Sequence, residues 1–217
     1  MNKAHKMDLL VALYIFLLCA AELMGGKTFP IISSGAIKLN ASVAIFLIPF
    51  IFSINDVITE VYGPERARNV IRSGLLVISL IIGFGMLATS LPPSMRFQLT
   101  ESAYDTIFQQ SIRISLASLI AFALSDFLDV YLFSKIRKAL GKQNLWLRNN
   151  VSNIVSQLID TVVFMMLAFY ALNNPLGQNV AFLSSLILPY WLLKCFMSVI
   201  ETPFVYLGVS WLKRDSS

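Results

Sequence analysis

Residues 43–74 read VAIFLIPFIFSINDVITEVYGPERARNVIRSG, and this stretch decides the fold. It begins with the apolar run 43–54, continues with two carboxylates one helical turn apart, and then reaches Gly63-Pro64 and the basic stretch ERAR. Glycine commonly follows the last turn of a helix, and proline is favoured at the first helical position, where its missing N–H costs nothing. The stretch therefore predicts two helices joined by a tight turn, the first of them long and apolar enough to enter a membrane.

The composition of the whole chain supports a membrane protein. Of its 217 residues, 57% are hydrophobic and 13% are charged, with a mean hydropathy of +0.72. A water-soluble domain carries roughly a quarter charged residues, so this chain has too little polar surface for a soluble globule. The net charge of +5 would suggest nucleic acid binding in a soluble protein. Here the basic residues gather between apolar segments, which indicates membrane topology and no nucleic acid partner.

Six segments are apolar over the roughly 20 residues that a helix needs to cross a bilayer. They are 8–25, 42–62, 69–91, 112–133, 151–172 and 180–211. The first follows a short basic tail, as a signal peptide does, but further apolar segments follow it, so we expect a retained helix. Without an internal repeat or a domain boundary, the sequence predicts one all-α integral membrane domain of six transmembrane helices over 1–217.

The charges of the connections orient this domain. The connection between the fourth and fifth segments holds five basic residues and no acid: Lys135, Arg137, Lys138, Lys142 and Arg148. The connection between the fifth and sixth, NNPLGQN, is uncharged. Basic residues are retained on the cytoplasmic side of membranes. We therefore expect both termini to be cytoplasmic, although two lysines in the first connection run against the pattern.

Charged residues also occur inside the predicted membrane segments. They are Glu22, Asp56, Glu60, Arg113, Asp126, Asp129, Asp160, Lys194 and Glu201. A charge at the centre of a lone membrane helix costs about 2.5–3.5 kcal/mol on insertion scales. These side chains must pair with one another or face a polar cavity inside the bundle.

Helical spacing arranges the polar residues in lines. Asn153, Gln157 and Asp160 recur at steps of three and four, and Phe164 extends this face by one turn. Lys194 heads a second line, on the last segment. The two lines favour a hydrogen-bonding cavity in the inner half of the bilayer. The alternative is an ion pair between Asp160 and Lys194 that only fixes helix register, with the amides as interhelical contacts.

Catalytic and metal-binding motifs are absent from the sequence. One histidine (His5) and two cysteines in apolar runs (Cys19 and Cys195) cannot assemble a zinc or thiol–histidine site, and no phosphate-binding loop or nucleophile motif occurs. Carboxylate pairs such as Asp56 with Glu60 are a weak signal for Mg²⁺ in a membrane phosphotransferase. The sequence thus favours a protein that is no enzyme and holds neither metal nor cofactor.

Four stretches together resemble the queuosine precursor transporter family of vitamin-uptake-like integral membrane proteins. They are FSINDVITEVYGPERARNVIRSG (52–74), DFLDVYLFSKIRK (126–138), NNVSNIVSQLIDTVVF (149–164) and YWLLKCFMSVIETPFVYLG (190–208). The resemblance implies six helices similar to the substrate-binding subunits of energy-coupling-factor vitamin importers. It also implies import of 7-deazaguanine bases (preQ0, preQ1 or queuine) for tRNA modification, across the cytoplasmic (inner) membrane of a bacterium.

That substrate class suggests a role for each polar residue. A guanine-like edge presents two neighbouring donors, which the carboxylate of Asp160 can accept together. Gln157 and Asn153 can complete the hydrogen bonds of the ring, and Lys194 can donate to its carbonyl oxygen. Three further contacts are proposed, with Asp56 facing the cavity and Phe52 or Phe164 stacking on the ring. The remaining acids are assigned to proton coupling or gating: Glu60, Asp126 and Asp129.

One departure from the importer subunits concerns energy coupling. The first segment, LLVALYIFLLCAAELMGG (9–26), lacks the small residues every four positions that such subunits use to dock on a coupling partner. Stand-alone, proton-coupled transport is the simpler hypothesis. The alternatives are a substrate-binding subunit of a multi-component importer and a non-transporting membrane protein with internally paired charges. The coupling partner and the oligomeric state stay open at this point.

Overall fold

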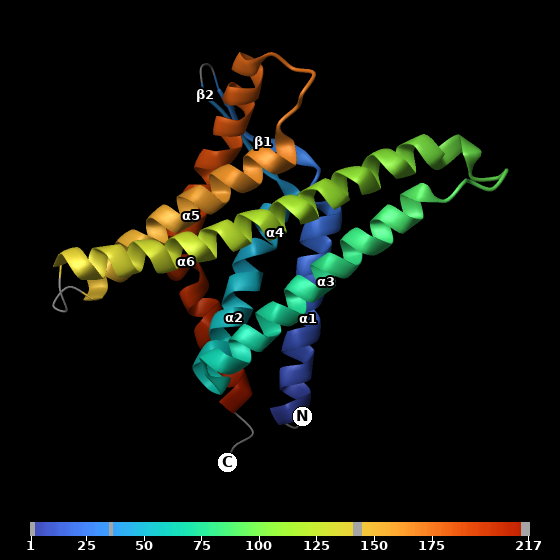
Figure 1. The fold of residues 1–217 in the computed structure, drawn as a ribbon. Helices are drawn as coiled ribbons and strands as arrows, with labels where there is room; N and C mark the ends of the chain where they lie inside the picture. Colours follow the sequence, from blue (N-terminus) through green and yellow to red (C-terminus); the bar gives the residue numbers. More distant parts are fainter. Residues whose placement is uncertain (1–2, 35–36, 141–144, 214–217) are drawn as a thin grey trace. The chain divides into compact units, whose positions relative to one another are not determined.

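The computed structural model describes the backbone of residues 3–34, 37–140 and 145–213. Within these ranges it describes no side chain for residues 3, 34, 37–38, 64, 126–127, 129–140, 145–153 and 197–202. The described residues form six α-helices, a 3₁₀ turn and a two-stranded sheet (Figure 1). In chain order these are α1 (Lys3–Met24), β1 (Thr28–Ser34), β2 (Ile37–Ser42), η1 (Val43–Phe46), α2 (Ile48–Tyr62), α3 (Pro64–Ser90), α4 (Gln98–Leu140), α5 (Leu145–Phe169) and α6 (Leu176–Lys213).

The helical, membrane-spanning character of the chain agrees with the prediction. Within the described part, five helices are long and apolar enough to cross a bilayer: Ala4–Met24, Val43–Tyr62, Glu65–Ser90, Gln98–Ser125 and Leu176–Phe196. A further apolar stretch, Ile154–Phe169 of α5, is shorter than a usual span. The prediction that six helices cross the membrane therefore stays a prediction.

Helices α4 and α6 begin before the apolar segments predicted within them. α4 begins at Gln98, well before the predicted start at 112, and α6 begins at Leu176, before the predicted start at 180. The part of α4 that precedes residue 112 includes the acidic residues Glu101 and Asp105. Apolar runs locate only the part of a helix that suits hydrocarbon, so a polar extension of the same helix escapes them.

The sheet was not predicted. Strands β1 and β2 pair as a hairpin between α1 and α2, within a segment that the sequence analysis treated only as a connection. Its sequence contains the β-branched residues Thr28, Ile31, Ile32 and Ile37, which favour extended backbone. The segment is too short and too polar to be a membrane helix, so the apolar runs of the sequence do not reveal it.

Contacts divide the chain into two compact units. Unit 1 comprises Met1–Phe29, Ser42–Ser115 and Phe196–Ser217, and unit 2 comprises Pro30–Ala41 and Leu116–Cys195. The core of unit 1 lies where α1, α2 and α3 meet. Its buried members are Met7, Tyr14, Leu17, Ile54, Ile58, Ala67 and Val70.

The turn between α2 and α3 is built as the sequence predicts. Gly63 ends α2, where its N–H donates to the Thr59 carbonyl at 3.0 Å, and Pro64 begins α3. The backbone of Gly63 has φ 87° and ψ 164°, a region that residues other than glycine hardly ever adopt. The arrangement lets the two helices meet with a single residue between them.

Glycines allow close helix packing within unit 1. A Cβ added at Gly208 of α6 would lie 2.7 Å from Cγ2 of Val57, a residue of α2 that is buried. A Cβ added at Gly74 of α3 would lie 3.0 Å from Cδ2 of Leu18 in α1. Small residues at such contacts are typical of membrane helix bundles, because they bring the backbones together.

Replacing Gly208 with alanine is expected to destabilise the protein by about 1–3 kcal/mol, because the new methyl overlaps Val57. Thermal unfolding of the detergent-purified protein measures the loss. Adding Val57→Ala should recover part of the loss by removing the overlapped atoms. Gly177→Ala is the matched control on α6, since no atom lies within 4 Å of its Cβ position. Equal effects at both glycines would contradict the packing argument.

One face of α3 exposes a row of large apolar side chains. Four of its large apolar side chains are between 53% and 72% exposed and recur at helical spacing: Leu76, Leu80, Phe84 and Leu87. The opposite side, with Val70, Ile78 and Ile82, is buried in unit 1. A helix that is apolar all round, with one face left open, suits a lipid environment.

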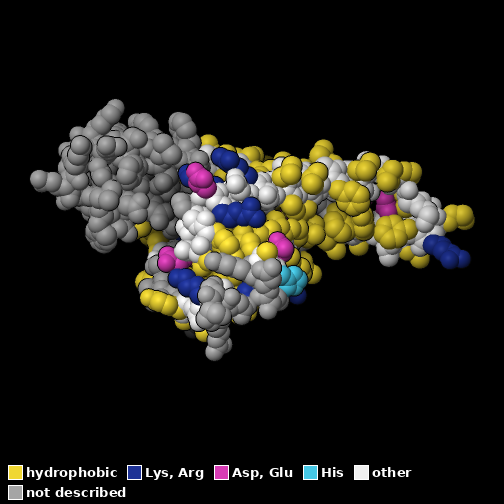
Figure 2. All heavy atoms as spheres, turned by 90° about the horizontal axis from the view of Figure 1, so that it is seen from below, with side chains coloured by type: hydrophobic (Ala, Val, Ile, Leu, Met, Phe, Trp, Pro, Cys, Tyr) yellow, Lys and Arg dark blue, Asp and Glu magenta, His cyan; other side chains and the backbone are white. Residues whose placement is uncertain are grey.

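Several charged side chains of unit 1 lie near the α2–α3 turn. Figure 2 shows lysine, arginine, aspartate and glutamate side chains grouped on the face that carries the α2–α3 turn, beside a largely hydrophobic surface. Glu65, Arg66 and Arg68 of this turn are exposed. Figure 1 shows the turn at the same end of unit 1 as the start of α1 and the end of α6.

Candidate functional site

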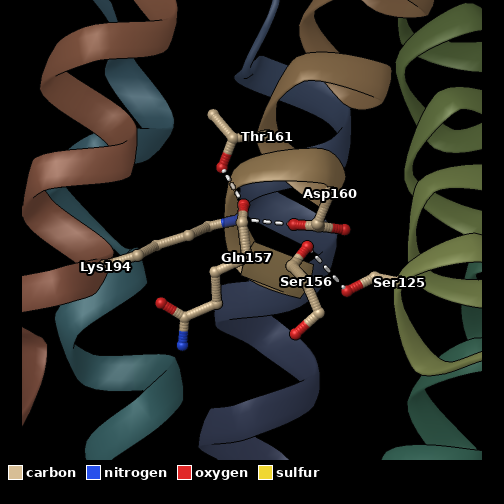
Figure 3. A network of polar contacts seen from close by, with 6 residues as sticks. All are labelled: Ser125, Ser156, Gln157, Asp160, Thr161 and Lys194. Atoms are coloured by element: carbon tan, nitrogen blue, oxygen red, sulfur yellow. Dashed lines mark hydrogen bonds and ion pairs between the residues drawn. The ribbon is translucent and has the colours of Figure 1, made fainter. Parts of the chain in front are cut away.

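An ion pair joins α5 to α6 in unit 2. The ammonium group of Lys194 donates to Oδ2 of Asp160, and the two side chains are only 16% and 23% exposed. The sequence analysis proposed both residues for the site and named their pairing as an alternative role. The structure confirms that they meet (Figure 3). A half-buried carboxylate and ammonium in contact present an acceptor and a donor side by side.

Hydrogen bonds hold α5 between its two neighbours. The Ser125 hydroxyl of α4 donates to the Ser156 carbonyl at 3.2 Å, while Lys194 reaches α5 from the other side (Figure 3). Within α5, the Thr161 hydroxyl donates to the Gln157 carbonyl at 2.8 Å. Ser156 and Thr161 are buried at 3% and 1% exposure. These contacts fix the turn of α5 that carries Asp160.

The connection between α5 and α6 is fixed by one asparagine. The side-chain oxygen of Asn179 accepts the Ala171 N–H at 2.9 Å, and its amide donates to the carbonyls of Ala171 and Asn174 at 2.8 and 3.1 Å. Asn179 is 3% exposed. Further along α6, Ser185 accepts a hydrogen bond from the Asn40 amide of β2 at 2.7 Å. The start of α6 is thereby tied to α5 and to the hairpin.

The other predicted residues of α5 are placed as follows. Gln157 lies one turn from Asp160, is half-buried, and its amide points toward the side from which Lys194 approaches (Figure 3). The Phe164 ring packs edge-to-face against Phe169, with ring centroids 6.3 Å apart. The side chain of Asn153 lies outside the described residues. On α4, the side chains of two predicted acids also lie outside them: Asp126 and Asp129.

The predicted residues of α2 belong to unit 1. This helix buries Ser53, Ile54, Val57 and Ile58. Its opposite face carries three of the predicted residues, all exposed: Phe52, Asp56 and Glu60. An exposed carboxylate within a candidate span is too costly to face hydrocarbon, so this face requires water or protein.

Several site residues escaped the sequence analysis. The sequence places Ser125 on one helix face with Asp129, but neither Ser125 nor Ser156 was assigned to the site. Trp191 was also not assigned to the site. It lies three residues before Lys194 on α6, so extending the polar line of Lys194 by one turn would have found it. Among the described residues, no group of three histidine, cysteine, aspartate or glutamate side chains could hold a metal ion.

The chain is similar to a family of membrane transporters. Residues 42–208 match the family model described as "Putative vitamin uptake transporter". The chain is 34% identical to the "Probable queuosine precursor transporter" of Bacillus subtilis (strain 168) over 76% of this chain and 70% of the relative. No solved structure matches it.

Two further relatives are matched over a shorter part. The chain is 30% identical to the "Queuosine precursor transporter" of Escherichia coli (strain K12) over 58% of this chain and 53% of the relative. It is also 30% identical to the "Probable queuosine precursor transporter" of Haemophilus influenzae, over 58% of this chain and 51% of the relative. These relatives are named as transporters, in agreement with the prediction that the chain is no enzyme. Because the family model spans most of its length, the chain belongs to the vitamin uptake transporter family that its resemblance to queuosine precursor transporters predicted.

Proposed function

We propose that this multi-pass membrane protein imports queuosine precursors, in particular 7-deazaguanine bases such as preQ0, preQ1 or queuine, for tRNA modification. The membrane would be the cytoplasmic membrane of a bacterium. The observation that carries the proposal is the half-buried pair of Asp160 and Lys194, in a chain whose relatives are named queuosine precursor transporters.

The pair suits the edge of a guanine-like base. Such an edge offers a ring N–H and an exocyclic amine as donors, next to a carbonyl oxygen as acceptor. The Asp160 carboxylate can accept both donors, and Lys194 can donate to the oxygen. Gln157, one turn away on the same helix face, can bond the remaining ring atoms, and Asn153 belongs to this line by spacing. Stacking by Phe164 would complete the contacts, and the stacking role of Phe52 stays a prediction from the sequence.

An even number of membrane crossings is supported by a contact between the two ends of the helical part. The Lys6 ammonium of α1 donates to the Trp211 carbonyl of α6 at 2.6 Å and lies 5.1 Å from the centroid of the indole ring. This contact supports placing the start of α1 and the end of α6 on one side of the membrane. The stretch Ile154–Phe169 adds a sixth crossing to the five longer helices.

The cytoplasmic side is proposed for both termini. Arg66 and Arg68 of the α2–α3 turn are exposed at the same end of unit 1 as the Lys6 contact (Figure 1). Basic residues favour the cytoplasmic face. A single domain of six helices would then resemble the substrate-binding subunits of energy-coupling-factor importers in helix number.

Proton coupling is proposed for the acids outside the pair. Asp56 and Glu60 occupy an exposed face of a candidate membrane helix, where a carboxylate that binds and releases protons can work. Asp126 and Asp129 are assigned to the same role from sequence. No coupling partner is needed in this scheme.

A 7-deazaguanine base is expected to raise the unfolding temperature of the detergent-purified protein. At 100 times its dissociation constant, a ligand adds about 2.7 kcal/mol to the folded state. The matched control is a 7-deazaadenine base, whose edge cannot offer two adjacent donors to a carboxylate. The absence of any shift in unfolding temperature with preQ0, preQ1, queuine or 7-deazaguanine would reject the proposal.

In cells, an uncoupler should abolish uptake of the labelled base.

A further inference from the structure

Helix α6 carries a buried hydrogen-bond donor that the site described above does not use. The indole nitrogen of Trp191 is buried and has no hydrogen-bond partner among the described residues. Of the described side chains in unit 2, it is the one with such an atom. Native proteins bond the great majority of their buried polar groups, since an unmet donor keeps its full desolvation cost. The candidate span Leu176–Phe196 contains Trp191, so bulk water is not at hand to satisfy it.

The position of Trp191 relates it to the ion pair. Residues three apart on a helix lie on the same face, so Trp191 adjoins Lys194 one turn along α6. Lys194 in turn contacts Asp160 of α5. A molecule bound at the pair would therefore lie within about one helical turn, roughly 5 Å, of the indole along the axis of α6.

The chemistry of the indole narrows what it can bind. Its N–H is a donor and cannot accept, so its missing partner must be an acceptor. On the edge that Asp160 would bind, a guanine-like base has a carbonyl oxygen with two lone pairs. Lys194 can use one of them and leave the other open. An adenine-like base has an amino group at that position, which would direct a donor at a donor.

We propose that the Trp191 N–H donates to the carbonyl oxygen of the bound base and thereby selects 6-oxo over 6-amino bases. This inference rests on the function proposed above. A site built to hydrogen-bond one substrate atom rejects an analogue that lacks it, because the buried donor is then left unpaired. Trp191 is thus a specificity-determining residue, and Asp160 and Lys194 bind the base.

Two variants and two ligands test the inference. Trp191→Phe keeps an aromatic ring and removes the donor. The ligands are 7-deazaguanine and 2-amino-7-deazapurine, which lacks the carbonyl oxygen and, because its N1 carries no hydrogen, also the ring donor to Asp160. We expect Trp191→Phe to bind 7-deazaguanine about tenfold more weakly and 2-amino-7-deazapurine as the wild type does. The ligand-free protein should unfold at the same or a higher temperature, since an unmet donor is removed. Tyr206→Phe on the same helix, at a side chain that is 74% exposed, is the control and should change neither affinity.

The outcomes separate this inference from the proposed function. Equal affinity of wild type and Trp191→Phe for 7-deazaguanine would overturn the role of Trp191 and leave the proposed function standing. A wild type that binds neither ligand would reject the proposed function itself. If Trp191→Phe fails to fold, 3-benzothienylalanine at position 191 gives the same test, because sulfur replaces the N–H with the ring shape kept. Unchanged affinity in that protein overturns the inference, and a selective loss for the oxo base supports it.

Discussion

Replacing Lys194 with methionine is expected to lower uptake of 7-deazaguanine bases at least tenfold and to destabilise the protein by about 3 kcal/mol. The change leaves the Asp160 carboxylate half-buried without its counter-charge, which is the costly way to break such a pair. It also removes a proposed donor to the base. Uptake of labelled base and thermal unfolding measure the two losses.

The double variant Asp160→Asn with Lys194→Met separates binding from structure. Removing both charges should return most of the lost stability, since two neutral side chains in contact are often tolerated where one lone charge is not. Uptake should stay low, because the carboxylate that accepts the two donors of the base is gone. Recovery of both quantities would show that the pair only fixes the register of α5 and α6.

Lys213→Met is the matched control, since this lysine is also on α6 but is exposed. It should leave uptake and unfolding unchanged. Normal uptake by Lys194→Met and by Asp160→Asn, at normal membrane levels, would remove both residues from the site.

Replacing Gly63 with alanine is expected to destabilise the protein by about 1–3 kcal/mol. At φ 87° and ψ 164° the cost comes from the backbone of residue 63, since no atom lies within 4 Å of the position that the new Cβ would occupy. The turn must either strain or shift α3 against α2, which carry much of the unit 1 core. Thermal unfolding in detergent measures the loss.

Gly83→Ala is the matched control on α3. Its Cβ would also meet no atom within 4 Å, but its backbone is helical. Alanine is favoured over glycine in helices by roughly 0.5–1 kcal/mol, so this variant should be as stable as the wild type or slightly more stable. Equal losses at Gly63 and Gly83 would show that the backbone of Gly63 is not responsible.

The helices and the α2–α3 turn could be predicted because strong local signals encode them. Apolar runs locate candidate spans, and Gly63-Pro64 marks a helix end and a helix start in adjacent residues. The hairpin of β1 and β2 carries no membrane signal, and its strands depend on each other rather than on local preference. The polar extension of α4 before 112 also carries none, although it belongs to the same helix.

The site was predictable in part. Charges inside apolar segments are rare enough that Asp160 and Lys194 attract attention, and depth along the helices makes their pairing plausible. The spacing of Trp191 from Lys194 is visible in the sequence, but a tryptophan in an apolar run looks the same whether or not its N–H is satisfied. Its importance depends on what surrounds one nitrogen atom, which only a structure describes.

The contact between Lys6 and Trp211 has a consequence for the order of biosynthesis. Unit 1 draws its helices from both ends of the chain, whereas the helices of unit 2 are contiguous, from 116 to 195. Helix α1 must therefore wait for the end of α6 to be synthesised before the Trp211 carbonyl is available to Lys6. During that interval unit 2 can already assemble, so its ion pair can form while unit 1 is still incomplete. Completion of unit 1 is thus coupled to the synthesis of the last turns of α6.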